Sequence, residues 1–198
     1  MAKTSKQWLR RHVTDHYVRK ARAQGYRSRS AYKLLEIDSQ EKLLRPGMVV
    51  LDLGAAPGGW SQVAAAKVKP GGRVVAVDLL PIAPISGVAV IQGDFREVSL
   101  LEDEKADVVL SDLSPNLSGI GNVDQARALE LSGAAIDLCR KALKPDGVFL
   151  VKVFQGEAFG ELVQHLKRSF SNVKVVKPRA SRGESNETYV LARNLRAL

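Results

Sequence analysis

The chain has 198 residues, of which 45% are hydrophobic and 26% charged, and its formal net charge is +9. This composition excludes a disordered or collagen-like chain, and the length fits one globular domain. The single cysteine, Cys139, excludes a disulfide framework and a cysteine-rich zinc site and is typical of a reducing compartment. No apolar run approaches about 18 residues, and none follows the basic N-terminus. We therefore expect a cytoplasmic protein without a membrane span or secretory signal.

The positive charge is concentrated at the N-terminus. Residues 1–33 contain ten basic side chains and one acid, whereas the remaining 165 residues contain 20 basic and 20 acidic side chains. Aromatic residues lie among the basic groups, at Trp8, Tyr17, Tyr26 and Tyr32. Basic groups neutralise phosphates while aromatic rings stack on bases, so this pattern favours nucleic-acid binding over a merely solvated basic face. We expect residues 1–44 to form a basic, helical, nucleic-acid-binding extension of a single domain over residues 1–198.

Short apolar runs after residue 44 predict buried strands, and several of the segments between them predict helices. The predicted strands are Met48–Leu53, Arg73–Val77, Val88–Ile91, Val108–Leu110, Val148–Val153, Val173–Val176 and Thr188–Ala192. Apolar residues recur at helical spacing between Val123 and Lys144 and between Phe159 and Phe170, and another helix is expected to begin near Trp60. Such alternation predicts an open α/β sheet with helices on both faces.

The last two predicted strands depart from this alternation. About a dozen polar residues without helical periodicity separate Val173–Val176 from Thr188–Ala192, so we expect these two strands to pair antiparallel. The sequence therefore predicts a seven-stranded, mostly parallel sheet with an antiparallel last strand.

A glycine-rich segment follows the first predicted strand, at the edge where such sheets bind ligands. It reads DLGAAPGGWSQ, from Asp52 to Gln62, and its glycines let the backbone approach a ligand closely. The segment lacks the lysine of a P-loop and the GxGxxG of a dinucleotide-binding turn, so it favours a nucleoside-type ligand without a pyrophosphate. The alternative is a strand–helix turn without a ligand.

Each of the first four predicted strands ends in a loop that carries an aspartate. After the second, third and fourth strands these are Asp78, Asp94 and Asp112, respectively. Asp78 lies 20 residues after Gly58, a spacing at which a carboxylate can accept hydrogen bonds from ribose hydroxyls. One such aspartate is usually a turn or capping residue. Several at one edge repel one another unless a ligand or cation compensates, which favours S-adenosylmethionine with its adenosine and sulfonium cation.

Lys152 lies inside the run GVFLVKVF, which predicts a buried central strand where an unpaired lysine is rare. A structural ion pair would explain it, but a catalytic role is favoured because Lys152 falls at the functional end of the strand. Glu187 precedes the last strand, whose antiparallel direction brings its start to the same edge. The topology thus predicts that Asp112, Lys152 and Glu187 lie together, and it does not place Lys33.

At these residues the chain resembles the FtsJ/RrmJ-type ribosomal RNA 2′-O-ribose methyltransferases, the RlmE family. Motifs in the order and spacing of that family cover nearly the whole chain. They are RSRSAYKL (Arg27–Leu34), DLGAAPGGWSQ, VDLLPI (Val77–Ile82), QGDF, SDLSPN (Ser111–Asn116), VKVFQGE (Val151–Glu157) and an SR…E-x-Y segment ending in Tyr189. The resemblance implies a Rossmann-like, S-adenosylmethionine-dependent methyltransferase fold.

The resemblance also implies roles for individual residues. A catalytic tetrad maps onto Lys33, Asp112, Lys152 and Glu187, with Lys152 as the proton acceptor. Cofactor contacts map onto Gly58, Trp60, Asp78, Asp94 and Asp112. The implied reaction is methylation of a ribose 2′-hydroxyl in RNA, on a uridine of large-subunit ribosomal RNA in the assembled subunit.

Other functions remain open at this point. Transfer RNA or a messenger-RNA cap could be the substrate, and the chain could be a non-catalytic RNA-binding assembly factor. A nicotinamide-dependent oxidoreductase is disfavoured by the missing GxGxxG. We expect no metal site, because His12 and His16 are four residues apart without a third ligand nearby, and we expect a monomer.

Overall fold

A computed structural model describes residues 15–97, 101, 104–114, 121–156, 159–181 and 185–196. Within these residues, seven strands form one sheet in the order β3-β2-β1-β4-β5-β7-β6. The strands are β1 (Val49–Leu53), β2 (Arg73–Asp78), β3 (Val88–Gln92), β4 (Ala106–Ser111), β5 (Leu143–Phe154), β6 (Phe170–Val176) and β7 (Glu187–Leu195). Neighbouring strands are parallel, except that β7 runs antiparallel to β5 and β6. This confirms the predicted mostly parallel sheet with an antiparallel last strand.

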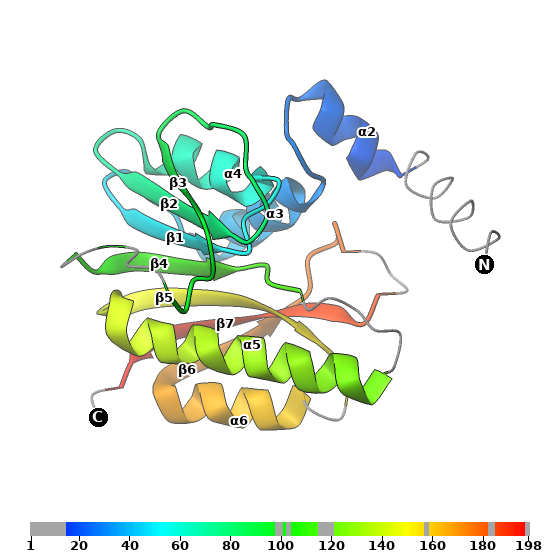
Figure 1. Cartoon of the computed structure of the whole chain (residues 1–198), viewed down its shortest axis with the longest axis vertical. Helices are drawn as coiled ribbons and strands as arrows, with labels where there is room; N and C mark the ends of the chain where they lie inside the picture. Colours follow the sequence, from blue (N-terminus) through cyan, green and yellow to red (C-terminus); the bar gives the residue numbers. More distant parts are fainter. Residues whose placement is uncertain are drawn as a thin grey trace.

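Helices cover both faces of the sheet. The described helices are α2 (His16–Ala23), α3 (Ser30–Glu41), α4 (Gly59–Val68), α5 (Gly121–Ala142) and α6 (Phe159–Ser169). Helices α5 and α6 lie on one face, while α3 and α4 lie on the other (Figure 1). Strand β5 shows why two cores form: Phe149 and Val151 pack in the α5–α6 core and Leu150 in the α3–α4 core, because successive side chains of a strand point to opposite faces. The single cysteine, Cys139, is buried in the α5–α6 core.

The largest departure from the predicted boundaries is at β5. The sequence predicts a strand from Val148, yet β5 begins at Leu143. Leu143 already pairs with Ala106 of β4, and the register between the two strands then shifts before Val148. Because β5 starts early, α5 ends at Ala142 rather than at the predicted Lys144.

The described part of the N-terminal extension consists of α2 and α3, whereas Trp8 and His12 lie outside the described residues. Helix α2 is capped by Asp15, whose carboxylate accepts the backbone N–H of Tyr17 at 2.9 Å. A small core of Ala21, Tyr32 and Ala180 attaches α2 both to α3 and to the connection between β6 and β7. The described helices of this extension are therefore joined to the sheet domain, and nucleic-acid binding by this segment stays a prediction.

Candidate active site

Three strands bring functional side chains to one edge of the sheet. Ser111, the last residue of β4, is the register partner of Val151 in β5, so the next residues, Asp112 and Lys152, are neighbours. Strand β7 begins at Glu187 on the same edge, because it runs antiparallel to β5. These three side chains lie together, as the topology predicts.

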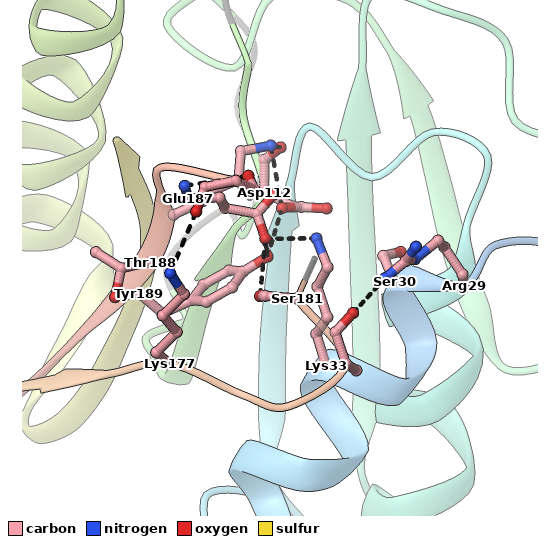
Figure 2. A network of polar contacts seen from close by, with 12 residues as sticks. Arg29, Ser30, Lys33, Asp112, Lys177, Ser181, Glu187, Thr188 and Tyr189 are labelled. Atoms are coloured by element: carbon pink, nitrogen blue, oxygen red, sulfur yellow. Dashed lines mark hydrogen bonds and ion pairs between the residues drawn. The ribbon is translucent and has the colours of Figure 1, made fainter. Parts of the chain in front are cut away.

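Two ion pairs occupy this edge. The ammonium group of Lys152 lies 3.1 Å from Oδ1 of Asp112 and donates to the backbone oxygen of the same residue at 2.7 Å. Lys33, one turn into α3, places its ammonium group 2.5 Å from Oε1 of Glu187. Figure 2 shows Lys33, Asp112 and Glu187 converging from separate elements. The structure thus places Lys33, which topology alone does not, beside the other three.

Tyr189 joins the two pairs and has no role in the sequence-based predictions beyond ending a motif. Its hydroxyl lies 3.3 Å from Oδ1 of Asp112 and 3.2 Å from Oε1 of Glu187, and it can donate its one proton to either carboxylate. Its ring lies 5.8 Å from the Lys33 ammonium, and Tyr189 is the cross-strand partner of Lys152. One buried residue therefore neighbours all four members of the tetrad. Figure 2 shows Tyr189 beside three of them, Lys33, Asp112 and Glu187.

The antiparallel pairing of the last strand predicts that some residue of it faces Lys152, but it does not by itself select Tyr189. That inference requires the register between β5 and β7, because shifting it by one residue would turn the ring to the other face of the sheet. The register is set by packing across the whole strand pair, which the local pattern does not reveal.

The charges of this cluster balance one another. Burial acts to raise the pKa of Glu187, but the neighbouring Lys33 and Lys152 ammonium groups and the Ser181 hydroxyl outweigh it and hold the pKa below its usual value. Burial raises the pKa of Tyr189 well above its ordinary value, and the carboxylates of Asp112 and Glu187 raise it further. The phenol therefore stays protonated at neutral pH and remains a hydrogen-bond donor.

A cavity of about 600 Å³ lies beside the cluster and shares Asp112 with it. It is lined by the ends of β2, β3 and β4, with Arg127 and Glu130 of α5 on the opposite side. The predicted cofactor residues Asp78, Asp94 and Asp112 all contribute to its lining. The volume is that of a typical small-molecule site, and carboxylates from three strand ends suit a ligand with hydroxyl groups and a positive charge.

The carboxylates of this cavity are held by nearby backbone groups. Asp78 accepts the N–H of Leu80 at 2.8 Å and that of Ala56 at 2.9 Å, which ties the ends of β1 and β2 together. Asp94 accepts the N–H of Arg96 at 2.9 Å and forms an ion pair with its guanidinium group at 2.5 Å. Hydrogen bonds from Arg96 hold the pKa of Asp94 below its usual range, so this carboxyl is ionised at neutral pH.

Trp60 is not part of the described lining of the cavity, and its predicted cofactor contact stays a prediction. The indole ring is buried in the core beneath α3, donates its N–H to the backbone oxygen of Ser30 at 2.8 Å and packs against Tyr189. Its fused apolar rings are better buried than exposed in a partly polar cavity. Any cofactor contact by Trp60 would have to come from its main chain.

Gly58 is not part of the described lining of the cavity either. It has φ of +106°, and a Cβ there would lie 2.5 Å from Cδ1 of Ile85, so its glycine identity allows two loops to pack closely. Gly54 and Ala56 of the same segment do line the cavity. A Cβ on Gly54 would meet Leu113 at 2.9 Å, so glycine is required there for close approach to the β4 loop.

Asp52 is a further unusual carboxyl behind this cavity. It is fully buried and accepts a hydrogen bond from the Ser61 hydroxyl at 2.5 Å. Burial raises its pKa to about 7; the Ser61 hydrogen bond opposes this shift, and the charges of Asp112 and Asp78 add to it. The sequence places Asp52 at the end of a strand but gives no sign that the group titrates near neutrality.

Comparisons with known proteins identify the family. The model of the FtsJ-like methyltransferase family matches residues 26–195. The chain belongs to this family. It is 53% identical over 196 residues to the ribosomal RNA large subunit methyltransferase E of Nitrosospira multiformis, covering 96% of this chain and 95% of that protein. It is 52% identical over 201 residues to the protein of the same name from an Azoarcus species, covering 98% of each chain.

Solved structures agree with this family assignment. A Plasmodium falciparum protein assigned as a ribosomal RNA methyltransferase superposes with a TM-score of 0.77 and 28% identity, over 86% of this chain and 98% of that one. Fibrillarin from Aeropyrum pernix, solved with bound S-adenosyl-L-methionine, shows the same fold at a TM-score of 0.59 and 17% identity, over 84% of this chain and 75% of that one. This FtsJ-like chain therefore has the Rossmann-like methyltransferase fold that its motifs imply.

Two searches of the described residues bear on other site types. No helix among them is long and apolar enough to cross a membrane. Within the same part of the chain, no three His, Cys, Asp or Glu side chains gather as a metal site would require.

Proposed function

We propose that this FtsJ-like protein transfers the methyl group of S-adenosylmethionine to a ribose 2′-hydroxyl in RNA. The observation that carries the proposal is the placement of two Lys–carboxylate pairs beside a cavity of cofactor size. Asp112 belongs to one of these pairs and also lines the cavity. The relatives in Nitrosospira and Azoarcus are ribosomal RNA large subunit methyltransferases, which supports large-subunit ribosomal RNA as the substrate. The modified nucleotide would be a uridine in the assembled subunit. The enzyme would act as a cytoplasmic monomer.

The cavity fits S-adenosylmethionine in size and in chemistry. Asp78 would accept hydrogen bonds from the ribose hydroxyls, and Asp94 lies at the next strand end. Asp112 is the member of the tetrad that also lines the cavity. Leu79, Leu80 and Leu113 add apolar surface that suits a purine ring. When bound, the cofactor supplies a methyl group on a sulfonium centre, which is already a good leaving group.

The tetrad would then align the ribose and manage its proton. The 2′-oxygen takes up the methyl group and must give up its proton, and Lys152 is the proposed acceptor, once its ammonium group has released a proton to solvent. Lys33 and Glu187 would hold the ribose through hydrogen bonds. The Tyr189 hydroxyl, 3.2 Å from Oε1 of Glu187, would help to hold that carboxylate in position. Fixing the reacting groups in this way supplies alignment, which is the chief requirement of such a transfer.

The exposed basic face of α2 is the proposed RNA contact. Arg19, Lys20 and Arg22 are exposed on this helix. The Ala21–Tyr32–Ala180 core fixes α2 to α3, the helix that supplies Lys33. Phosphate contacts on α2 would therefore position RNA relative to the tetrad.

Mass spectrometry of ribosomal RNA nucleosides, from cells with and without this protein, tests the proposal. We expect one 2′-O-methylated uridine of large-subunit RNA to depend on the protein and on Lys152. With the purified protein and labelled cofactor, intact large subunits should be methylated and naked RNA much less. Methylation of transfer RNA or cap RNA instead, or RNA binding without any methyl transfer, would overturn it.

A further inference from the structure

The basic side chains of the N-terminal extension do not form one uniform surface. Those of α2 are exposed, and they are Arg19, Lys20 and Arg22. Arg29 and Lys33, which follow α2, are directed into the protein: Lys33 pairs with Glu187, and Arg29 pairs with Asp15 and donates to the backbone oxygen of Ala180. Arg27 also belongs to this second group, but its contacts lie on the side of the cofactor cavity.

The guanidinium group of Arg27 bridges two loops through their backbone oxygens. One terminal nitrogen donates to the oxygen of Ala83 at 2.6 Å and to that of Pro57 at 3.3 Å. The other donates to the oxygen of Pro84 at 2.7 Å. A planar guanidinium group can address several acceptors at fixed angles, and hydrogen bonds from a charged donor are stronger than neutral ones.

The main chain of Arg27 is fixed as well. Its N–H donates to the side-chain oxygen of Gln62 in α4 at 2.9 Å, and the Gln62 amide donates back to the oxygen of Gly25 at 3.0 Å. At Gly58 a Cβ would lie 3.3 Å from an Arg27 nitrogen and 2.5 Å from Ile85. The arginine, the glycine-rich loop and the loop after β2 therefore pack as one unit.

The two bridged loops are those that line the cavity. Pro57 follows Ala56, which lines the cavity and donates its N–H to Asp78. Ala83 and Pro84 lie in the segment that continues from Leu79 and Leu80, which also line it. The Asp78–Ala56 hydrogen bond joins these loops at the cavity, and Arg27 joins them again on the side of α3 and α4.

We infer that Arg27 is a positioning residue for the adenosyl cofactor and not an RNA ligand, an inference that rests on the proposed function. Its guanidinium group holds the two loops at the separation that the cavity requires. Hydrogen-bond donors already directed at three backbone oxygens are poorly available to a phosphate. Within a single run of basic residues, α2 would thus serve RNA while Arg27 serves the cofactor site.

The test compares two basic residues of the same extension in the full-length protein. Affinity for S-adenosylmethionine is measured by calorimetry without RNA, and affinity for fluorescein-labelled large-subunit ribosomal RNA by anisotropy at several salt concentrations. Arg27→Lys keeps the charge but has its donors on one nitrogen, in place of the two terminal nitrogens that contact the loops, so we expect cofactor affinity to fall about 10-fold. RNA affinity should change less than about 2-fold. Arg22→Ala should leave cofactor affinity unchanged and reduce the salt slope of RNA binding by about one ion.

The outcomes separate this inference from the function on which it rests. If the wild-type protein does not bind S-adenosylmethionine, the proposed function fails. If the wild type binds it and Arg27→Lys binds it equally well, or loses RNA affinity instead, the positioning role is wrong. Arg27→Ala should lose at least as much cofactor affinity as Arg27→Lys. If Arg27→Ala has a lower melting temperature than the wild type, the test rests on the cofactor affinity of Arg27→Lys, whose melting temperature should be unchanged.

Discussion

The tetrad and the cofactor cavity share Asp112 but are built in different ways. In the tetrad, each charged side chain contacts a partner far away in the sequence: Lys33 and Glu187 are 154 residues apart, and the Lys152 amine reaches across 40 residues to Asp112. In the cavity, Asp78 and Asp94 each accept an N–H only two residues further along the chain. The tetrad is assembled by long-range contacts, and the cavity carboxylates are set largely by their own loops.

Because of this difference, we expect the two regions to respond differently to substitution. Removing one member of the tetrad leaves an oppositely charged, largely buried partner, so its effects should be large, specific to turnover and non-additive. Removing a cavity carboxylate changes one contact to the ligand and a local turn, so its effect should fall on cofactor affinity. Four substitutions test whether the two regions are separable in this way.

The largest effect is expected at Lys152. Its side chain is only 8% exposed and its amine contacts Asp112 twice, so Lys152→Ala removes the proposed proton acceptor. We expect methyl transfer to fall about 1000-fold, within the range of general base catalysis. Calorimetry should show cofactor affinity within about 3-fold of the wild type, since the cavity keeps its own carboxylates.

Lys174 provides the matched control. It lies on the edge strand β6, is exposed and pairs with Glu41 far from the tetrad, so Lys174→Ala should turn over normally. Turnover by Lys152→Ala within about 3-fold of the wild type would contradict the assigned role.

The cavity should give the opposite pattern. Asp78→Asn removes the charge that would face the ribose hydroxyls and one of the two backbone hydrogen bonds, because the amide nitrogen cannot accept. Because hydrogen bonds to a charged group contribute about 1.5–3 kcal/mol, we expect cofactor affinity to fall about 10- to 100-fold. The turnover number at saturating cofactor should stay within about 3-fold. Asp146→Asn, at an exposed position of β5, is the control that should change neither quantity.

A mixed result for Asp78→Asn would change the comparison. A large loss of turnover at saturating cofactor, with affinity unchanged, would mean that the cavity and the tetrad act as one unit.

Tyr189→Phe tests whether the tetrad needs its central hydroxyl. The change removes a donor from between Asp112 and Glu187 while keeping the buried ring and its packing on Trp60. Because one hydrogen bond to a charged group is lost, we expect the turnover number to fall about 10-fold and its pH profile to shift, with cofactor affinity unchanged. Initial rates measured between pH 6 and pH 9 would check this.

Tyr32→Phe is the matched control for a merely structural effect. The Tyr32 hydroxyl donates to Gln24 at 2.6 Å and lies in the α2–α3 contact, so its loss should cost stability without changing turnover. Equal effects of the two substitutions on turnover would argue against a specific role for Tyr189.

The smallest effect is expected behind the cavity, from the titration of Asp52. Its pKa is raised to about 7 in the folded protein, so the folded state holds this proton more tightly than the unfolded state does. The resulting stability is fully present below the unfolded pKa of about 4 and is lost as pH rises toward about 7. Asp52→Asn cannot titrate and can still accept from Ser61.

The melting temperature of Asp52→Asn should therefore rise relative to the wild type between pH 5 and pH 8, by a few degrees. The exposed Asp146→Asn should follow the wild type across that range. A constant difference between Asp52→Asn and the wild type at all pH values would show that Asp52 does not titrate there.

The sequence determines the strand alternation, the antiparallel last strand and the aspartates at the strand ends, because each depends on a short local pattern. The glycine-rich loop can also be predicted, since glycine at position 54 allows the close approach to the loop after β4 that the structure shows. The direction of the Trp60 side chain could not be predicted, because a motif gives residue identity and not direction, and a large ring next to a core is buried by the hydrophobic effect.

Only the tertiary structure decided how these parts meet. The position of Lys33 depends on how α3 packs across the sheet, and the central place of Tyr189 depends on the β5–β7 register. The division of the N-terminal charge depends on which carbonyl oxygens Arg27 reaches after folding. Local patterns determine which groups reach an edge of the sheet, whereas contacts between distant segments arise only when those segments pack, so their geometry belongs to the whole fold.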